Sequence, residues 1–426
     1  MIDISLIRDK PSLVKENIKK KNQLEKLPLV DEVVKLDSQI RKLKTEAQEL
    51  RAERNNLSLK INEAKKAKKD VKSILQKAKK IPDEIKLLED EETKLMDILK
   101  GIMLKIPNMI SKQTPLGKDA SQNKVIKKGG TIKRFDFQVK THVELAENLG
   151  IADFEASSRV SGKGFYYLKG DLALLNQALI RFAIDFMQKK GYTYIETPLM
   201  LNTRSIYASM DKEAIEQSVY SIKDEDLNLI GTAEQSLLAM HTDETISENQ
   251  LPKKYTSYSM CFRKEIGAHG INEKGLWRTH QFNKIEQFIF CRPEDSEKFY
   301  DELLKNSEEL LKKLDLPYRV LEICSGDLAD WKSRSADLEV YRPTTKEYGE
   351  VMSLSNCTEY QARKLNIKCV DAKGNKRVLH TINNTALATS RIMVAILENN
   401  QNKDGSITIP KILVPYIGKL KITRGG

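Results

Sequence analysis

Charged side chains are concentrated in one otherwise apolar stretch, MCFRKEIGAHGINEKGLWRTHQFNKIEQFIF, at residues 260–290. Both ends of this stretch are rich in aromatic residues and lack proline, which favours two strands. The part between Gly267 and Gly275 is polar and bounded by glycine, which favours a loop. Side chains of like parity share one face of a strand. We therefore expect Arg263 and Glu265 to share a face of the first strand.

The second strand is expected to carry a charged face that includes one phenylalanine. Its members are Arg278, His280, Phe282, Lys284 and Glu286. An arginine guanidinium can bridge two oxygen atoms in a planar fork, which a lysine ammonium cannot match. Taken singly, an Arg or Glu also fits a surface ion pair, and a Phe also fits a core position. Their shared parity favours a binding surface, and parity alone does not say what that surface binds.

Two heptad stripes precede this region and predict a helical arm. The first stripe is Leu29, Val33, Leu36, Ile40, Leu43, Ala47, Leu50, Arg54, Leu57, Ile61 and Ala64, and the second is Val71, Ile74, Ala78, Ile81, Ile85, Leu88, Glu92, Leu95, Leu99 and Ile102. One polar residue interrupts each stripe. The pattern predicts an antiparallel coiled-coil hairpin over residues 29–105, with a first helix on the order of 55–60 Å long. Pro82 lacks a helical N–H, so we expect a kink there and an intact arm.

Lysines gather around the bend between these two helices. The segment 59–80 holds nine lysines against Glu63 and Asp70. A solvated helix face explains many such runs. At the end of a projecting rod, however, lysines suit a phosphate backbone, and such contact is salt-sensitive and carries little sequence information. We expect an RNA recognised by its shape to contact Lys65, Lys66, Lys68, Lys69 and Lys72.

Composition limits the classes of protein that fit. The 426 residues suffice for two or three domains. The net charge of +12 fits a polyanionic partner such as nucleic acid, and a merely soluble basic protein stays an open alternative. The five cysteines form no C-x-x-C pair, which favours reduced thiols over zinc ligands or disulfides. The sequence contains neither a signal-peptide pattern nor a run of about 18 apolar residues, so we expect a cytoplasmic protein without membrane contact.

The sequence predicts an arm, a linker and a globular body. We expect an N-terminal RNA-binding domain at residues 1–106 that contains the arm. Residues 107–131 are rich in Gly, Lys, Ser and Thr, which favours a linker. Residues 132–426 alternate between strand and helix patterns, beginning with an amphipathic helix that closes near Gly191 and a short strand that ends at Pro198.

Several motifs in this body resemble one enzyme family. GYTYIETP, FRKE…GLWRTHQFNKIE and NNTALATSRIMVAILENNQ are similar to the three signatures of class II aminoacyl-tRNA synthetases, with Arg391 at the fixed arginine of the third. GTAEQSL and EVMSLSNCTEYQARKL resemble elements of seryl-tRNA synthetases, as does the arm. The resemblance covers essentially the whole chain. It implies an α+β fold, with an antiparallel sheet flanked by helices behind the coiled-coil hairpin, and a homodimer with the segment around Pro198 at its interface.

The resemblance also implies an ATP-dependent serine–tRNA ligase. Arg263 matches the position that binds the α-phosphate and the substrate carboxylate, while Arg278 and Arg391 match those that restrain the outer phosphates of a bent ATP. Phe282 would stack beneath adenine, and Glu265 would accept a hydrogen bond from its amino group. The three arginines are the expected catalytic residues. The expected ATP-binding set is Arg263, Lys264, Glu265, Arg278, Phe282, Glu350, Val351, Met352, Ser353 and Arg391.

Serine and a metal ion are assigned in the same way. The serine-binding set implied by the resemblance is Thr232, Ala233, Glu234, Arg263, Glu286 and Thr385. Thr385 departs from the Ser of many bacterial members, and its hydroxyl bonding only a backbone carbonyl stays an open alternative. Glu350 and Ser353 match the positions that hold Mg²⁺ with ATP, and oxygen ligands suit that ion. The histidines and cysteines show no zinc-ligand spacing, so no zinc is expected.

The expected partners are tRNA(Ser), ATP, L-serine and a second copy of the chain. Whether tRNA(Sec) is also charged is left open. One rival hypothesis is a catalytically silent homologue that binds RNA or protein, although every expected charged site position is filled. A second rival is an enzyme that aminoacylates carrier proteins, whose relatives lack the arm that this chain has.

Overall fold

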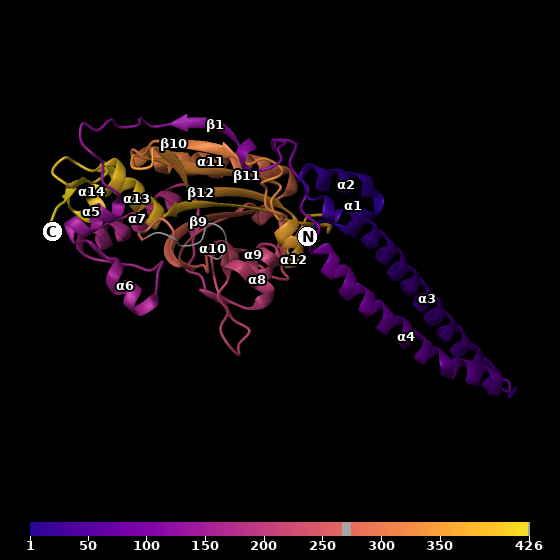
Figure 1. Cartoon of the computed structure of the whole chain (residues 1–426). Helices are drawn as coiled ribbons and strands as arrows, with labels where there is room; N and C mark the ends of the chain where they lie inside the picture. The colour runs from indigo at the N-terminus through magenta and orange to yellow at the C-terminus, as the bar shows by residue number, and fades with distance from the viewer. Residues whose placement is uncertain (266–273, 425–426) are drawn as a thin grey trace. The chain divides into compact units, whose positions relative to one another are not determined.

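The computed structural model describes residues 1–265 and 274–424. The chain divides into two compact units, Met1–Pro107 and Asn108–Gly426 (Figure 1). Within the described ranges, no helix combines the length and the apolar character that a membrane span requires. Cys261, Cys291, Cys324, Cys357 and Cys369 are all buried and free of disulfide bonds.

The first unit is a long helical hairpin on a small helical base. Helices α1 (Ile4–Asp9) and α2 (Pro11–Lys20) precede α3 (Leu27–Lys66) and α4 (Lys72–Met103). The base is tied to α3 by Arg8, whose guanidinium donates to both carboxylate oxygens of Asp37 at 2.6 and 2.8 Å. The 40 residues of α3 extend for ~60 Å at 1.5 Å per residue.

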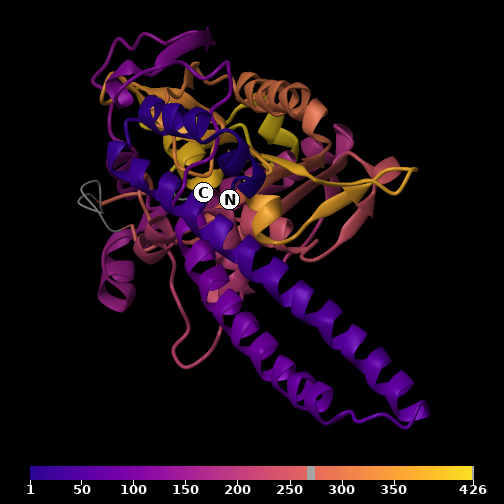
Figure 2. The ribbon, with the colours of Figure 1, turned by 90° about the vertical axis from the view of Figure 1, so that its right-hand side faces the viewer.

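The heptad pattern accounts for this hairpin. Every apolar member of both stripes is buried or half-buried, whereas Arg54 is exposed and Glu92 pairs with Lys44 at 3.4 Å. Figure 2 shows α3 and α4 side by side and joined by a short turn. Helix α4 continues through Pro82 without ending. The predicted coiled-coil hairpin is confirmed.

The second unit is built on an eight-stranded sheet. The strand order is β1 (Lys124–Gly129), β10 (Tyr318–Glu322), β11 (Arg334–Arg342), β12 (Glu347–Thr358), β15 (His380–Ala388), β9 (Gln281–Cys291), β8 (Lys253–Phe262) and β4 (Thr193–Tyr194). Neighbouring strands are antiparallel except β4, which runs parallel to β8. The predicted α+β class, with an antiparallel sheet flanked by helices, is therefore confirmed.

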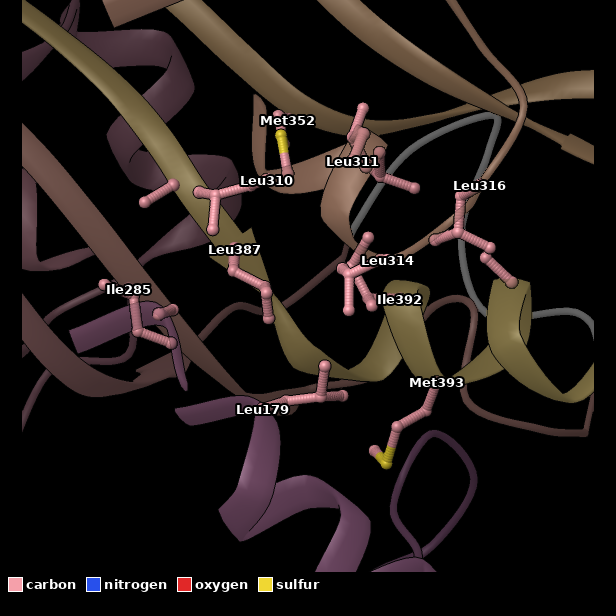
Figure 3. Close-up of a cluster of buried hydrophobic side chains, with 14 of the residues drawn as sticks. Leu179, Ile285, Leu310, Leu311, Leu314, Leu316, Met352, Leu387, Ile392 and Met393 are labelled. Atoms are coloured by element: carbon pink, nitrogen blue, oxygen red, sulfur yellow. The ribbon is translucent and has the colours of Figure 1, made fainter. Parts of the chain in front are cut away.

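Three helices cover one face of this sheet. They are α7 (Gly170–Lys189), α11 (Ser296–Lys313) and α13 (Thr389–Asn399). Figure 3 shows the core between them, where Leu179 of α7, Ile285 of β9 and Leu387 of β15 lie together with the apolar side chains of α11 and α13. Helix α7 ends as its sequence predicts, since Gly191 directly afterwards takes a φ of +84°, which favours glycine.

Shorter elements surround the sheet. The helices are α5 (His142–Leu149), α6 (Phe154–Ser161), α8 (Thr203–Ser209), α9 (Lys212–Ser218), α10 (Ala233–Ala239), α12 (Tyr360–Lys364) and α14 (Val414–Ile417). The strands are β2 (Ala152–Asp153), β3 (Tyr167–Leu168), β5 (Met200–Leu201), β6 (Asn228–Leu229), β7 (Thr245–Ser247), β13 (Lys368–Val370), β14 (Lys376–Val378), β16 (Ile407–Thr408) and β17 (Lys421–Ile422).

The segment 107–131, expected from its composition to be a linker, is structured along much of its length. Strand β1 forms the edge of the main sheet by pairing with β10. The Asn108 side-chain amide donates to the carbonyl oxygens of Trp331 and Cys357 at 3.0 and 2.8 Å. Gly and Lys are common in loops, but here backbone pairing holds them in the second unit.

Candidate active site

The face of the sheet opposite the three helices carries a cavity. Strand β9 alternates across the sheet, because Ile285 and Ile289 belong to the main core while Phe282, Lys284 and Glu286 line the cavity. The cavity volume is about 430 Å³, within the range of small-molecule sites. Arg263, Arg278, Phe282 and Glu286 all line it, so the charged groups of the two flanks meet in one space.

Parity explains only part of this convergence. Strand β8 ends at Phe262, and Glu265 has a φ of +48°, so the expected shared strand face of Arg263 and Glu265 is wrong. Arg278 and His280 likewise precede β9, and His280 Nδ1 instead lies 2.9 Å from the carbonyl oxygen of Arg263. The chain leaves the sheet at these residues. The conformation of the turn, and not the alternation of a strand, therefore sets the direction of their side chains. Most of the predicted loop, residues 266–273, lies outside the described residues.

Two arginines on these turns are already oriented by the protein. Arg263 Nε donates to the Gly231 carbonyl oxygen at 3.1 Å, and its guanidinium lies 5.3 Å from the centre of the Phe282 ring. Arg278 Nη1 donates to Glu265 Oε2 at 3.2 Å. These contacts hold the two guanidinium groups in the cavity wall with further donors available for an anionic ligand.

A third arginine approaches from α13. Arg391 Nη1 donates to the Glu350 carbonyl oxygen at 2.8 Å and lies 3.4 Å from Glu350 Oε1. Its guanidinium also lies 5.5 Å from the Trp277 ring, and Arg342 lies 4.5 Å from the same ring. Trp277 thus lines the cavity and contacts two arginines.

A buried network anchors Trp277. The Leu276 N–H donates to His142 Nε2 at 3.2 Å, and His142 Nδ1 lies 3.1 Å from Glu398 Oε1. Glu398 also accepts hydrogen bonds from Arg342 and from the Thr344 hydroxyl, at 3.0 and 2.7 Å. Burial alone would raise the pKa of Glu398, but the bonds from His142, Arg342 and Thr344 lower it to about 2. This carboxylate is therefore charged in the folded protein.

The deep end of the cavity holds two carboxyl groups. Glu286 is 1 % exposed, accepts from the Thr232 hydroxyl at 3.1 Å and pairs with Lys284 Nζ at 2.7 Å. Glu234 accepts from the side-chain amides of Gln361 and Asn383 at 2.7 and 3.0 Å. Burial and then the charge of Glu286 raise the pKa of Glu234. A cationic ligand placed here would favour the ionised form of Glu234.

Thr385 also lines this end of the cavity, next to an irregularity in the β15–β9 pairing between Thr385 and Leu387. Its carbonyl oxygen accepts from the Ser307 hydroxyl at 3.3 Å. Within the described residues, no hydrogen bond engages its own hydroxyl, which can therefore contact a ligand. The alternative of a hydroxyl bonded to a backbone carbonyl gains no support.

Oxygen donors line the β12 wall of the cavity. Glu350 and Ser353 both line it, and Asp337 lies opposite Ser353 in the β11–β12 register. Burial and then the charge of Glu350 raise the pKa of Asp337. Hard oxygen donors of this kind fit Mg²⁺. No group of three or more His, Cys, Asp or Glu side chains is placed to hold a metal across residues 1–265 and 274–424.

The structure does not bring every predicted residue into the cavity. Val351 lines it, but Met352 points into the hydrophobic core, as Figure 3 shows, because the pleat of β12 alternates. Ala233 is fully buried at the start of α10, and Lys264 is held by its backbone N–H to the Ser218 carbonyl at 2.9 Å. Their expected contacts with ligand can come only from backbone atoms or from a rearranged side chain.

Sequence reasoning missed several cavity residues. Trp277, Trp331, Lys332 and Asn383 line the cavity without having been predicted, and Lys284 was placed on the right face without a role. The shared parity of Lys284 with Glu286 was a usable signal. Trp331 and Lys332 precede β11 in a segment without periodicity, so only the folded chain shows their position.

The predicted RNA-contacting lysines belong to the first unit. Lys65 and Lys66 end α3, Lys68 forms the turn with a φ of +52°, and Lys72 begins α4. Lys65, Lys66, Lys68, Lys69 and Lys72 are all exposed. None of the five forms an ion pair with any residue that the structure describes, so their charges face solvent at the end of the hairpin.

Comparisons with known proteins match both units. The family model described as tRNA synthetase class II core domain (G, H, P, S and T) matches residues 218–400, and that described as seryl-tRNA synthetase N-terminal domain matches residues 1–110. A serine–tRNA ligase of Methanocella arvoryzae is 45 % identical over 99 % of this chain and 100 % of its own length.

Solved structures agree with the sequence relatives. The seryl-tRNA synthetase of Pyrococcus horikoshii, complexed with ATP, has a TM-score of 0.95 and 39 % identity, covering 100 % of both chains. The cytoplasmic serine–tRNA ligase of Naegleria fowleri, in complex with AMP, has a TM-score of 0.89 and 30 % identity, covering 100 % of this chain and 99 % of the other.

Proposed function

The chain belongs to the seryl-tRNA synthetase family, and from this premise we propose that it activates L-serine with ATP and transfers the serine to tRNA(Ser) in the cytoplasm. One observation supports this most strongly. A single cavity of about 430 Å³ carries fixed arginines along its wall and paired buried carboxyl groups at its deep end. Such a cavity can hold an anionic nucleotide beside a small amino acid.

In the first step, a serine carboxylate oxygen bonds to the α-phosphorus of ATP, and the bond from that phosphorus to the bridging oxygen breaks to release pyrophosphate. Arg263 faces both reacting groups, while Arg278 and Arg391 restrain the outer phosphates. Phe282 supplies a flat surface for adenine, with Glu265 accepting from its amino group. Fixed cations lower the barrier because they need no reorganisation as charge develops.

The deep end selects the amino acid. Glu286 accepts from the serine hydroxyl, and Glu234 with Thr232 holds the ammonium group. An alanine would leave the buried acceptor unpaired and is rejected for that reason. A threonine must be excluded by the cavity wall near Thr385.

Mg²⁺ would be held by Glu350 and Ser353 together with ATP oxygens. When bound, the ion supplies positive charge to the phosphates. Asp337 lies opposite Ser353 in the β11–β12 register, behind the residues that line the cavity. These donors suit the ion because all of them are hard oxygens.

The second step joins the two units in function. A ribose hydroxyl at the 3′ end of tRNA attacks the activated carbonyl of serine, and AMP leaves. We propose that residues 1–106 bind the tRNA, with Lys65, Lys66, Lys68, Lys69 and Lys72 contacting its phosphates, and that residues 132–426 hold the chemistry. We also propose a homodimer that uses the segment around Pro198, where Leu199 and Met200 are 36 % and 47 % exposed.

Serine-dependent exchange of pyrophosphate into ATP tests this function. The purified chain should exchange with serine and should not exchange with alanine or threonine. A silent homologue would show no exchange with any amino acid and would contradict the proposal. An enzyme for carrier proteins would exchange with serine but would fail to charge tRNA(Ser), so a charging assay with the same preparation separates that rival.

A further inference from the structure

Lys332 lines the cavity and has no role yet in the proposed reaction. It lies between β10 and β11, and its ammonium group is held at the β12 wall. Lys332 Nζ donates to the Ser335 hydroxyl at 3.1 Å and to the Ser353 hydroxyl at 3.4 Å. Ser335 in turn donates to the Leu354 carbonyl oxygen at 2.7 Å, which fixes the hydroxyl that receives the lysine.

The ammonium group shares this wall with the proposed metal donors. Ser353 is one of those donors, Glu350 is another, and Asp337 faces Ser353 across the β11–β12 ladder. Lys332 thus stands beside this group of oxygen donors through its contact with Ser353. Glu350 itself pairs with Arg391, at 3.4 Å.

A divalent ion at Ser353 would lie close to this ammonium group. Mg²⁺ binds its oxygen ligands at roughly 2.1 Å, and Lys332 Nζ is 3.4 Å from the same Ser353 oxygen. Two positive charges that contact one hydroxyl oxygen repel strongly inside a cavity wall. The empty pocket should therefore resist a divalent ion, unless further negative charge enters with it.

Resting on the proposed function, we propose that Lys332 is a resident cation of the nucleotide pocket that makes metal entry depend on ATP. Its ammonium group satisfies Ser353 and offsets the carboxylates while the pocket is empty, and it contributes positive charge to the incoming phosphates. The phosphates then bring the negative charge that allows a divalent ion to bind beside it.

Mn²⁺ binding by the nucleotide-free protein tests this directly, with free Mn²⁺ followed by electron paramagnetic resonance. Lys332→Met should bind Mn²⁺ at least about tenfold more tightly than the wild-type chain, because the repelling charge is gone. Lys332→Gln is a second neutral variant if Lys332→Met folds poorly. Lys332→Arg keeps the charge and should bind as weakly as the wild type.

Two further variants locate the effect. Lys346→Met removes the same charge from the exposed turn between β11 and β12, outside the cavity, and should leave Mn²⁺ binding unchanged. Adding Glu350→Gln to Lys332→Met should abolish the gained affinity, because it removes a donor of the proposed site. Calorimetry with ATP in excess chelator should show Lys332→Met binding metal-free ATP on the order of tenfold more weakly.

Unchanged Mn²⁺ affinity in both neutral variants would overturn the inference, as would a gain that persists after Glu350→Gln. These outcomes are separate from the fate of the proposed function. A wild-type chain without serine-dependent exchange would defeat that function, whereas an exchanging chain whose Mn²⁺ affinity ignores Lys332 would defeat only the role of this lysine.

Discussion

The arm and the catalytic unit place their charged side chains in opposite surroundings. In α3, the buried residues all lie between Val30 and Ala47, and the remaining turns toward the bend contain none. The arm pair Arg51–Glu89 has both side chains 46 % exposed, whereas the cavity pair Lys284–Glu286 has side chains 8 % and 1 % exposed. Exposed pairs contribute little and are screened by salt, while breaking a buried pair leaves an uncompensated charge.

This difference separates two kinds of binding surface. The outer half of the arm has few buried contacts, which is typical of segments with low local stability that can adapt to a partner. The cavity is fixed by buried hydrogen bonds before any ligand arrives, as at Glu234 and Glu398. We therefore expect substitutions in the arm to act on tRNA binding in a salt-dependent way, and substitutions in the cavity to act on serine activation at any salt concentration.

Shortening the arm should produce the largest effect. Replacing residues 50–88 with a short Gly/Ser turn removes the outer half of the hairpin, together with the buried Ile81 and Ile85, and keeps the buried residues of α3. We expect tRNA charging to fall by about three orders of magnitude, because the phosphate contacts of the tip are lost. Pyrophosphate exchange should stay within about twofold of the wild type. If exchange fell together with charging, the two surfaces would not be separable.

Removing the buried charge of Glu398 should lower the free energy of unfolding of the second unit by about 3 kcal/mol. The reason is that the pKa of Glu398, about 2, lies well below the usual value of a glutamate. The lowered pKa stabilises the folded state fully above about pH 4.5, and this contribution disappears as the pH falls toward 2. Glu398→Gln should therefore differ most from the wild type at neutral pH and least at low pH in urea unfolding followed by circular dichroism. The exposed Glu347→Gln serves as control, and a constant difference across pH would contradict this assignment.

The third prediction concerns serine selection. Glu286→Ala should weaken the serine dependence of exchange about a hundredfold, since the hydroxyl loses its acceptor and Lys284 loses its partner. The KM for ATP should change far less. Glu294→Ala removes an exposed carboxylate that pairs with Arg377 and should leave both constants as they are. An unaltered serine dependence in Glu286→Ala would remove this residue from the amino-acid pocket.

The smallest effect is expected at the tip of the arm. Changing Lys65, Lys66, Lys68 and Lys69 together to Gln should weaken tRNA binding about tenfold at low salt and flatten its dependence on salt concentration. The matched control changes Lys10, Lys15, Lys19 and Lys20, which removes the same charge from α2 and from the residue before it. A salt dependence equal to that of the wild type would assign the tip lysines to solvent.

The two units also differ in how far their sequences predict them. The spacing of the apolar residues is enough to predict the hairpin, because the heptad pattern repeats along each helix. Arg54, the polar residue that interrupts the first stripe, is exposed. In the catalytic unit, parity correctly placed Phe282, Lys284 and Glu286 because β9 is extended there. It failed at Glu265, where a positive φ turns the chain away from the sheet.

Contacts between distant parts of the chain explain the features that the sequence did not predict. Lys332 reaches the cavity from a segment without periodicity, and its neighbour Ser353 is 21 residues further along the chain. His142 contacts Glu398 across 256 residues of sequence and Leu276 of the charged stretch across 134. Composition misled in the segment 107–131, since pairing with β10 makes a strand of residues that are common in loops.

Both tryptophans of the chain, Trp277 and Trp331, line the cavity. Indole emission depends on nearby charge and on stacked rings, so the tryptophan fluorescence of this protein, excited apart from its 14 tyrosines, reports from the cavity. A nucleotide that enters the cavity should quench or shift that emission. An RNA held only by the lysines of the arm should leave the emission unchanged. One unlabelled sample can thus distinguish occupancy of the two surfaces.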